Sequence, residues 1–154
     1  MALEIERKFT VKNEDWKGLS YQENNIAQGY LNSSPDRTVR IRISNNEGFI
    51  TIKSKNSGAV RSEFEYSIPL NEATELLAMC EKPTISKTRY LIDFKNHTWE
   101  VDVFKEENQG LIVAEIELSS QNESFEIPEW IGEEVTNDKR YYNSALISFP
   151  FCEW

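Results

Sequence analysis

The chain has 154 residues, of which 28% are charged and 12% aromatic, and its formal net charge at pH 7 is −9. This length suits one domain with a buried core, so we expect residues 1–154 to form a single domain. The acidity argues against nucleic acid and anionic membranes as partners, because both need a basic surface. It does not exclude a small anionic ligand, since the potential inside a concave site can oppose the net charge.

Targeting segments and metal-binding cysteines are not indicated either. Four charged residues, Glu4, Glu6, Arg7 and Lys8, occupy the place where a secretory signal would have its apolar stretch. No apolar run approaches the roughly 20 residues that cross a bilayer. Cys80 and Cys152 form neither a CxxC pair nor a zinc-ligand spacing. We therefore expect a cytoplasmic protein in a reducing compartment.

Seven segments alternate charged and apolar residues with the period of two that is typical of β-strands, and eight strands are predicted in all. These strands lie at residues 2–11, 25–32, 37–44, 48–55, 60–69, 84–94, 98–105 and 111–119. The short connections between them are rich in Asn, Gly, Ser and Pro, which favour turns. This hairpin-like spacing predicts a mainly β (α+β) protein built on an eight-stranded antiparallel closed barrel.

Short helices are expected to cover the apolar outer faces of this barrel. Four are predicted: one behind Asn13, one over residues 72–80, one near Pro128 and one over residues 139–148. Proline suits the first turn of the third helix, and Asn71 and Asp138 are the candidate N-caps of the second and fourth. Helices outside would leave the ionic strand faces in the lumen, so that the barrel is inside-out.

Like charges recur at every second position in several of these strands. The basic pairs are Arg40 with Arg42, Lys53 with Lys55 and Lys87 with Arg89, and the acidic pairs are Glu4 with Glu6, Glu100 with Asp102 and Glu115 with Glu117. Such neighbours lie roughly 7 Å apart and repel by about 2 kcal/mol at an effective dielectric of about 20. The wet face of an ordinary sheet, with acids and bases paired across strands, is the alternative interpretation. The segregated signs favour a lumen in which a polyanion relieves the bases and divalent cations relieve the acids.

The bases are suited to hold phosphate groups. Arginine binds phosphate oxygens in a bidentate manner, and lysine supplies a movable point charge. The chain has no glycine-rich phosphate loop, so side chains must take the place of backbone amides. The candidate substrate-binding residues are Lys8, Arg40, Arg42, Lys53, Lys55, Arg61, Lys87 and Arg89.

The acids are suited to hold Mg²⁺ or Mn²⁺, which prefer oxygen ligands. The first candidates for metal ligands are Glu4, Glu6, Glu115 and Glu117, and the second are Glu63, Glu65, Glu100 and Asp102. Some of these carboxylates are equally suited to pair with bases of the lumen. A water activated by the metal or by a carboxylate would attack the terminal phosphorus of a triphosphate.

The N-terminal motif "EIERKF" resembles the ExExK signature of the CYTH superfamily, the triphosphate tunnel metalloenzymes. The resemblance continues in order through "QGYL", "VRIR", "IKSK", "RSEFEY", "SKTRY", "WEVDVF", "AEIEL" and "EEVTNDKRYYNSAL". It implies an eight-stranded antiparallel tunnel that binds a triphosphate and a divalent metal, and it points to the pairs Glu4 with Glu6 and Glu115 with Glu117 as metal ligands. Members of this superfamily include inorganic, thiamine and RNA triphosphatases and class IV adenylate cyclases.

Five residues are the candidates for the chemistry itself: Glu4, Glu6, Lys8, Lys87 and Tyr30. Tyr30 either shapes the reactive end of the tunnel with a lysine or is a core aromatic. Asp138 and Asn143 are interpreted as capping or structural residues.

The expected function is hydrolysis of inorganic tripolyphosphate to pyrophosphate and phosphate with Mg²⁺ or Mn²⁺. The alternatives are a class IV adenylate cyclase, a thiamine or nucleoside triphosphatase and, last, a non-catalytic polyphosphate-binding barrel. The expected partner is a small molecule with a triphosphate group, and the protein is expected to be a monomer or a homodimer.

Overall fold

The computed structural model describes residues 3–154. Its strands are β1 (Leu3–Val11), β2 (Gln22–Asn32), β3 (Arg37–Ser44), β4 (Glu47–Ser54), β5 (Val60–Ile68), β6 (Ile85–Phe94), β7 (His97–Phe104), β8 (Ile112–Glu117) and β9 (Ile131–Glu134). The α-helix is α1 (Leu70–Ala78), and the 3-10 helices are η1 (Asp15–Leu19), η2 (Glu106–Asn108), η3 (Lys139–Tyr141), η4 (Asn143–Ile147) and η5 (Phe151–Glu153). None of these helices has the length and hydropathy of a membrane-spanning segment.

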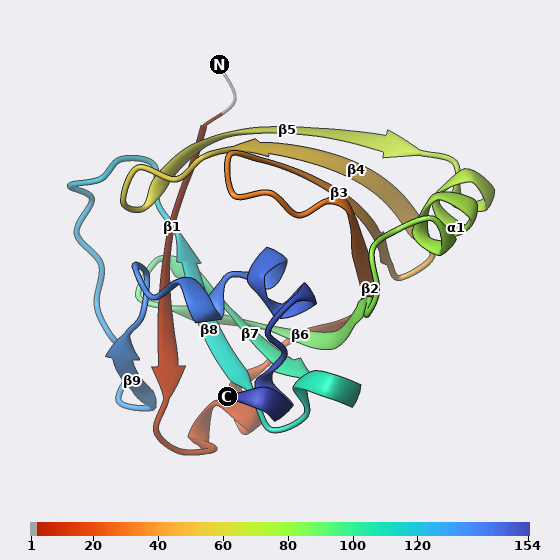
Figure 1. Ribbon diagram of the computed structural model, residues 1–154. Helices are drawn as coiled ribbons and strands as arrows, with labels where there is room; N and C mark the ends of the chain where they lie inside the picture. The colour runs from red at the N-terminus through yellow and green to blue at the C-terminus, as the bar shows by residue number, and fades with distance from the viewer. Residues whose placement is uncertain (1–2) are drawn as a thin grey trace.

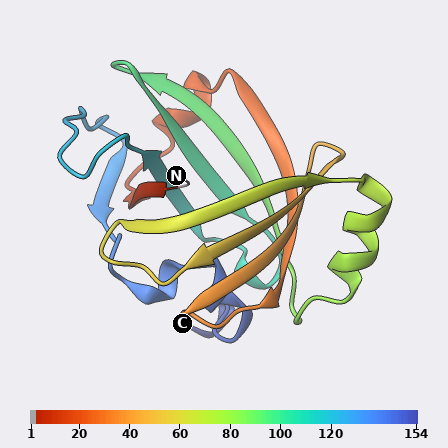
Figure 2. The ribbon, with the colours of Figure 1, turned by 90° about the horizontal axis from the view of Figure 1, so that it is seen from above.

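The strands close into an antiparallel barrel, as Figures 1 and 2 show. Their order is β5-β4-β3-β2-β6-β7-β8-β1-β9, and a further pairing between β5 and β1 closes the ring of eight. Leu3 to Ile5 pair with β5, whereas Phe9 and Val11 pair with β9. One edge of β1 therefore changes partner along its length, which accommodates the ninth strand. The predicted eight-stranded closed barrel is confirmed.

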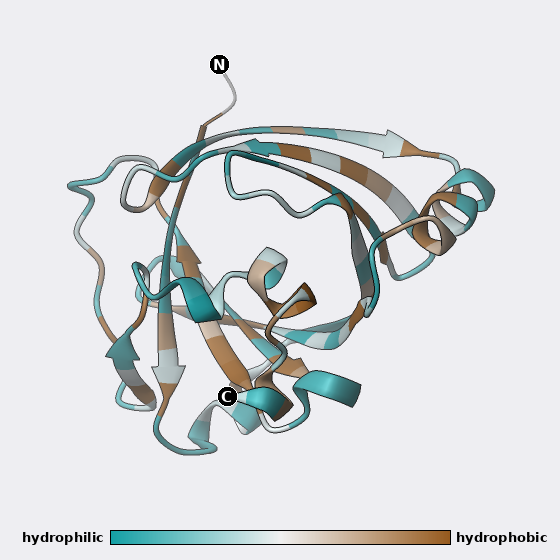
Figure 3. Cartoon of the chain, in the orientation of Figure 1, coloured by the Kyte–Doolittle hydropathy of each residue, from teal (hydrophilic) through white to brown (hydrophobic). Residues whose placement is uncertain are grey.

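The hydrophobic core lies outside the barrel wall. The outer faces of β1, β7 and β8 contribute Ile5, Phe9, Trp99 and Ile116, each less than 9% exposed. Because side chains alternate along a strand, the intervening residues point into the lumen. Figure 3 shows the resulting bands of hydrophobic and hydrophilic residues along the strands. Burying each of these large apolar side chains contributes roughly 1.5–3 kcal/mol.

The core continues beneath the covering segments. Trp16 of η1 packs on Tyr90, with ring centroids 5.2 Å apart, and Ala73 of α1 packs on Ile41 of β3. The segment after Asn13 is thus a 3-10 helix, and the Asn13 side chain accepts a hydrogen bond from the Asp15 amide at 2.9 Å. These contacts confirm that helices shield the outer faces of the barrel.

The helix predicted near Pro128 is wrong. Residues 131–134 form β9, which extends the sheet beside β1 where β5 no longer covers that edge. Gly132 permits the close approach, because a Cβ atom there would lie 2.3 Å from Thr10 Oγ1. Pairing an exposed strand edge satisfies backbone groups that a helix would leave free.

The continuous helix predicted over residues 139–148 is also wrong. The chain forms η3 and η4, which are separated by Tyr142 in an extended conformation (φ −69°, ψ 129°). Asp138 caps η3 as predicted, by accepting a hydrogen bond from the Arg140 amide. The break turns residues 142–144 toward the barrel mouth, so this segment does not lie wholly outside the barrel.

The predicted cap of α1 is wrong as well. The helix begins one residue before Asn71, and Pro69 occupies the N-cap position without a side-chain hydrogen bond. The Pro69 carbonyl accepts the first helical hydrogen bond, from the Ala73 amide at 2.9 Å. Proline imposes a φ that suits entry into a helix, and this displaces the boundary that the asparagine suggested.

Candidate active site

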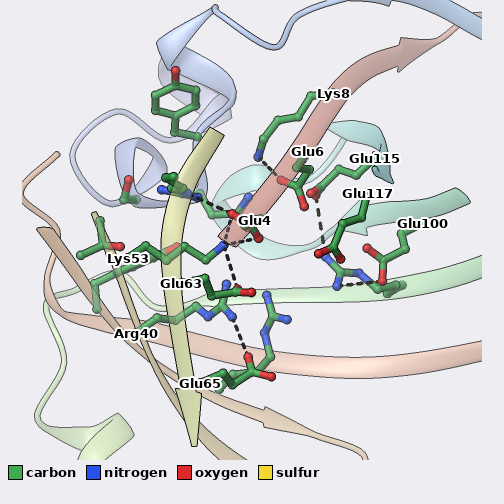
Figure 4. A pocket seen from close by; sticks show the side chains of 18 of the residues that line it. Glu4, Glu6, Lys8, Arg40, Lys53, Glu63, Glu65, Glu100, Glu115 and Glu117 are labelled. Carbon is green, nitrogen blue, oxygen red and sulfur yellow. Dashed lines mark hydrogen bonds and ion pairs between the residues drawn. The ribbon is translucent and has the colours of Figure 1, made fainter. Parts of the chain in front are cut away.

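A cavity of about 170 Å³ fills the barrel lumen, and Figure 4 shows its side chains. Its charged lining consists of the bases Lys8, Arg40, Arg42, Lys53, Arg61, Lys87 and Arg89 and the acids Glu4, Glu6, Glu63, Glu65, Glu100, Glu115 and Glu117. These are seven charges of each sign in a protein whose net charge is −9. The structure thus brings nearly all of the predicted site residues to one place.

Two predicted site residues do not reach this cavity. Lys55 lies just after the end of β4, is exposed, and lines a separate cavity at the barrel mouth. Asp102 is fully buried in the wall beside the lumen. Its carboxylate lies 2.7 Å from Lys87 Nζ and accepts two hydrogen bonds from Arg89, at 2.8 and 2.9 Å. Asp102 therefore holds two lumen cations, and the structure offers it no open coordination to a metal.

Glu4 has a similar supporting role at the other side of the lumen. Lys53 Nζ lies 2.9 Å from its carboxylate, and Arg61 Nε lies 3.0 Å from it. Burial alone would raise the pKa of Glu4, but the two cations outweigh burial and lower the pKa to about 2. Glu4 is thus ionised at neutral pH and pairs with Lys53, the lumen base of β4.

Arg40 and Arg42 have unused hydrogen-bonding capacity. Within residues 3–154, Arg40 Nε is buried and has no hydrogen-bond partner. Arg42 donates to the side-chain oxygen of Gln28 at 2.8 Å and has no carboxylate within ion-pairing distance in this part of the chain. Burial, followed by the like charges of Arg40 and Arg89, lowers the pKa of Arg42 to about 9. An anion in the lumen would relieve this repulsion.

Lys87 is a second base whose pKa its surroundings lower strongly. Burial lowers its pKa to about 7, the neighbouring Arg89 and Arg42 add to this effect, and Asp102 opposes it. A lysine with a pKa near neutrality can gain or lose a proton at working pH, whereas an ordinary lysine cannot.

Three acids of the neighbouring strands β1 and β8 line the same cavity, and we call Glu6, Glu115 and Glu117 the acidic cluster. Burial and the nearby Glu115 raise the pKa of Glu6 well above its ordinary value. Lys8, the hydrogen bond from Glu6 and Arg89 outweigh burial and lower the pKa of Glu115. The opposite directions of these two pKa shifts indicate that Glu6 binds a proton more readily than Glu115 does.

A divalent cation fits this acidic cluster by chemistry. It would offset the repulsion between these carboxylates and take their oxygens as ligands, as Mg²⁺ and Mn²⁺ prefer. Among residues 3–154, no group of three His, Cys, Asp or Glu side chains converges closely enough to form a complete metal site. The protein thus offers a partial ligand set of the kind that Mg²⁺ completes with water and substrate phosphates.

Tyr30 lies between the cavity and the core. It lines the cavity, and it is only 4% exposed because it packs with Ile85 and Leu146 in the core. Its ring thereby joins the lumen to the covering C-terminal segment.

Two neutral residues join the lumen bases: Gln28, which was not a predicted site residue, and Asn143, which was interpreted as a capping or structural residue. The Asn143 side-chain oxygen accepts hydrogen bonds from Lys87 Nζ and from Gln28 Nε2, each at 2.9 Å. Gln28 lies in phase with Tyr30 on β2, so the alternation of that strand could have revealed it. Asn143 follows the irregular Tyr142, and no periodic pattern indicates its position.

A closed barrel with an ionic lumen, unused guanidinium donors and a partial metal-ligand set defines a tunnel for a polyanion and a divalent cation. The chain belongs to the CYTH domain family, which matches residues 2–146. Membership implies a metalloenzyme that uses a divalent metal.

Two curated relatives span almost the whole chain. The inorganic triphosphatase of Acetivibrio thermocellus is 47% identical over 152 residues, which cover 98% of this chain and 97% of that protein. The inorganic triphosphatase of Nitrosomonas europaea is 37% identical, with coverage of 96% and 99%.

Solved structures have the same architecture. The crystal structure of the inorganic triphosphatase NE1496 matches with a TM-score of 0.68 and 35% identity, covering 97% of this chain and 98% of that one. A putative adenylyl cyclase from Hippeastrum matches with a TM-score of 0.59 and 15% identity, covering 78% and 80%, so it shares the fold alone.

Proposed function

We propose that this protein hydrolyses inorganic tripolyphosphate to pyrophosphate and phosphate with Mg²⁺ or Mn²⁺. The observation that carries the proposal is the placement of two arginines inside a closed tunnel. Arg40 has a buried Nε without a hydrogen-bond partner, and Arg42 donates to Gln28 but pairs with no carboxylate in residues 3–154. Relatives that span the whole chain at 47% and 37% identity are named for the same activity, which supports the substrate.

Substrate binding falls to the lumen bases of β1, β3, β4, β5 and β6. Arg40, Arg42 and Arg89 point into the lumen and can each donate two hydrogen bonds to phosphate oxygens. Lys8, Lys53 and Lys87 add point charges, and Arg61 stands at the end of the cavity where it holds Glu4. Their combined field neutralises the substrate, which is the main requirement of phosphoryl transfer.

The acidic cluster would hold the metal, with Glu63 and Glu65 as further carboxylates on β5. When bound, the metal would supply charge neutralisation and orient the phosphates. We assign the deprotonation of the attacking water to Glu117. Partial burial and the charges of Glu4 and Glu63 raise the pKa of Glu117 and make it a better base.

The reaction then needs one bond made and one broken. The water oxygen bonds to the terminal phosphorus, its proton passes to Glu117, and the bridging P–O bond breaks to release pyrophosphate. Lys87 is placed to donate a proton to the departing oxygen, because its pKa lies near 7. Tyr30 shapes this end of the lumen.

The test is phosphate release from tripolyphosphate, ATP and thiamine triphosphate, with Mg²⁺, Mn²⁺ or EDTA. We expect rapid, metal-dependent turnover of tripolyphosphate and a loss of at least about a hundredfold in kcat for Glu117→Gln. Glu75→Gln on α1 removes the same charge from an exposed position outside the cavity and should keep full activity. Cyclic AMP formed from ATP would instead favour a class IV adenylate cyclase, and preference for ATP or thiamine triphosphate would favour those triphosphatases.

We further propose that the chain acts as one cytoplasmic tunnel domain, as a monomer or homodimer, without a nucleic-acid or membrane partner. The closed barrel and the acidic net charge support this assignment.

A further inference from the structure

A second cavity adjoins the tunnel at one mouth. It has a volume of about 620 Å³ and is formed by three segments, residues 33–38, 55–61 and 137–148, which we call the vestibule. Thr38, Arg61, Tyr142 and Ser144 line both cavities, so the vestibule opens into the tunnel. In Figure 1 these segments are the β2–β3 loop, the β4–β5 loop and the blue segment that follows β9.

The vestibule carries positive charge only. Its charged lining residues are Lys55, Arg61 and Lys139, and no described lining residue is acidic. Lys55 and Lys139 are exposed and form no ion pair or side-chain hydrogen bond within residues 3–154. The acids nearby in sequence do not line the vestibule, and Asp138 is engaged by Arg140 at 2.8 Å.

This arrangement differs from the tunnel, where seven bases face seven acids. Such a balanced lining attracts an approaching anion only weakly, and the net charge of −9 repels it. Two unpaired lysines at one mouth reverse the sign of the local potential there. A concave cationic surface raises the rate at which anions reach a site.

We propose that the vestibule is an anion-capture site through which a condensed inorganic phosphate enters the tunnel, with Lys55 and Lys139 as its capturing residues. Arg61, which borders both cavities, passes the anion from the vestibule to the tunnel bases. Neither lysine takes part in bond breaking. The assignment rests on the proposed function for the identity of the substrate, but not for the direction of entry.

The test compares the double variant Lys55→Gln/Lys139→Gln with the wild type in tripolyphosphate hydrolysis at low and high ionic strength. At low salt we expect kcat/KM to fall roughly tenfold while kcat stays within about twofold, because capture precedes chemistry. At about 1 M salt the Debye length is about 3 Å, so the difference should shrink toward zero. Lys55→Arg/Lys139→Arg retains both charges and should restore kcat/KM.

Lys12→Gln is the matched control, because Lys12 is exposed at the end of β1 and lines neither cavity. If the double variant behaves like this control at low salt, or loses kcat instead of kcat/KM, the inference is overturned while the proposed function stands. Calorimetric binding of tripolyphosphate in EDTA gives a second readout. Should the wild type show no hydrolysis, a salt-dependent loss of binding in the double variant would still support the vestibule, and unchanged binding would overturn it.

Discussion

Asn143 and Lys87 meet across the tunnel mouth, where the amide oxygen of the C-terminal segment accepts a hydrogen bond from the lysine ammonium at 2.9 Å. The same oxygen accepts from Gln28, whose own oxygen accepts from Arg42. Two neutral amides thereby join two lumen cations. The covering segment is thus part of the site, because it fixes where Lys87 and Arg42 point.

Asn143→Leu should disturb binding more than folding. It removes the acceptor shared by Lys87 and Gln28, so we expect kcat/KM for tripolyphosphate to fall roughly tenfold and stability to fall by about 1–2 kcal/mol. Initial rates and urea unfolding measure the two effects. Asn71→Ala on α1 is the control, since Asn71 caps nothing in this structure and should change stability by less than about 0.5 kcal/mol. Full activity in Asn143→Leu would show that the amide bridge does not position the lysine.

Asp102→Asn should destabilise the protein strongly. The change leaves Lys87 and Arg89 without their buried counter-ion, and breaking such a pair typically costs about 3–5 kcal/mol. Urea unfolding should show this loss, and added tripolyphosphate should recover part of it by supplying negative charge. Asp93→Asn, on an exposed position of the neighbouring strand β6, is the control. An unchanged stability with a weaker response to Mg²⁺ would instead make Asp102 a metal ligand.

The lowered pKa of Glu4 leads us to expect that the stability of the protein depends on pH. Its folded pKa of about 2 lies below its ordinary value of 4.5, so the ionised form is favoured in the folded protein. The resulting stabilisation, roughly 3 kcal/mol, is complete above pH 4.5 and is lost as the pH falls through about 2. The gap in unfolding free energy between wild type and Glu4→Gln should therefore close on acidification. A gap that is constant with pH would argue against the ion pairs with Lys53 and Arg61.

The pKa of Lys87 leads us to expect that substrate binding depends on pH. With a pKa of about 7, it is cationic below neutral pH and loses its charge as the pH rises, so the free enzyme then binds a polyanion less well. We expect kcat/KM to decline above about pH 7 at fixed Mg²⁺, with a smaller decline in kcat because bound phosphate keeps the lysine protonated. Lys87→Arg stays charged and should move this decline to higher pH. The same profile in both enzymes would assign the decline to another group.

The barrel and most of the residues that line its lumen could be predicted from the amino-acid sequence. Strict alternation decides which face of a strand each residue occupies, and therefore Arg40, Lys53 and Glu115 could be placed in the lumen from their spacing alone. Alternation says nothing about how far along the barrel axis a residue lies. Lys55 is in phase with Lys53 and was therefore predicted to line the tunnel, but β4 ends before Lys55.

Which charged side chains form ion pairs depends on tertiary contacts and could not be predicted from the sequence. Asp102 and Glu115 both follow the alternating pattern, yet one is enclosed in the wall by Lys87 and Arg89 and the other lines the cavity. Cross-strand register and closure of the barrel set these distances. The same holds for Asn143, which reaches Lys87 because the chain breaks at Tyr142 and turns across the mouth. Local spacing encodes the direction of a side chain, whereas its partners depend on contacts between residues far apart in the chain.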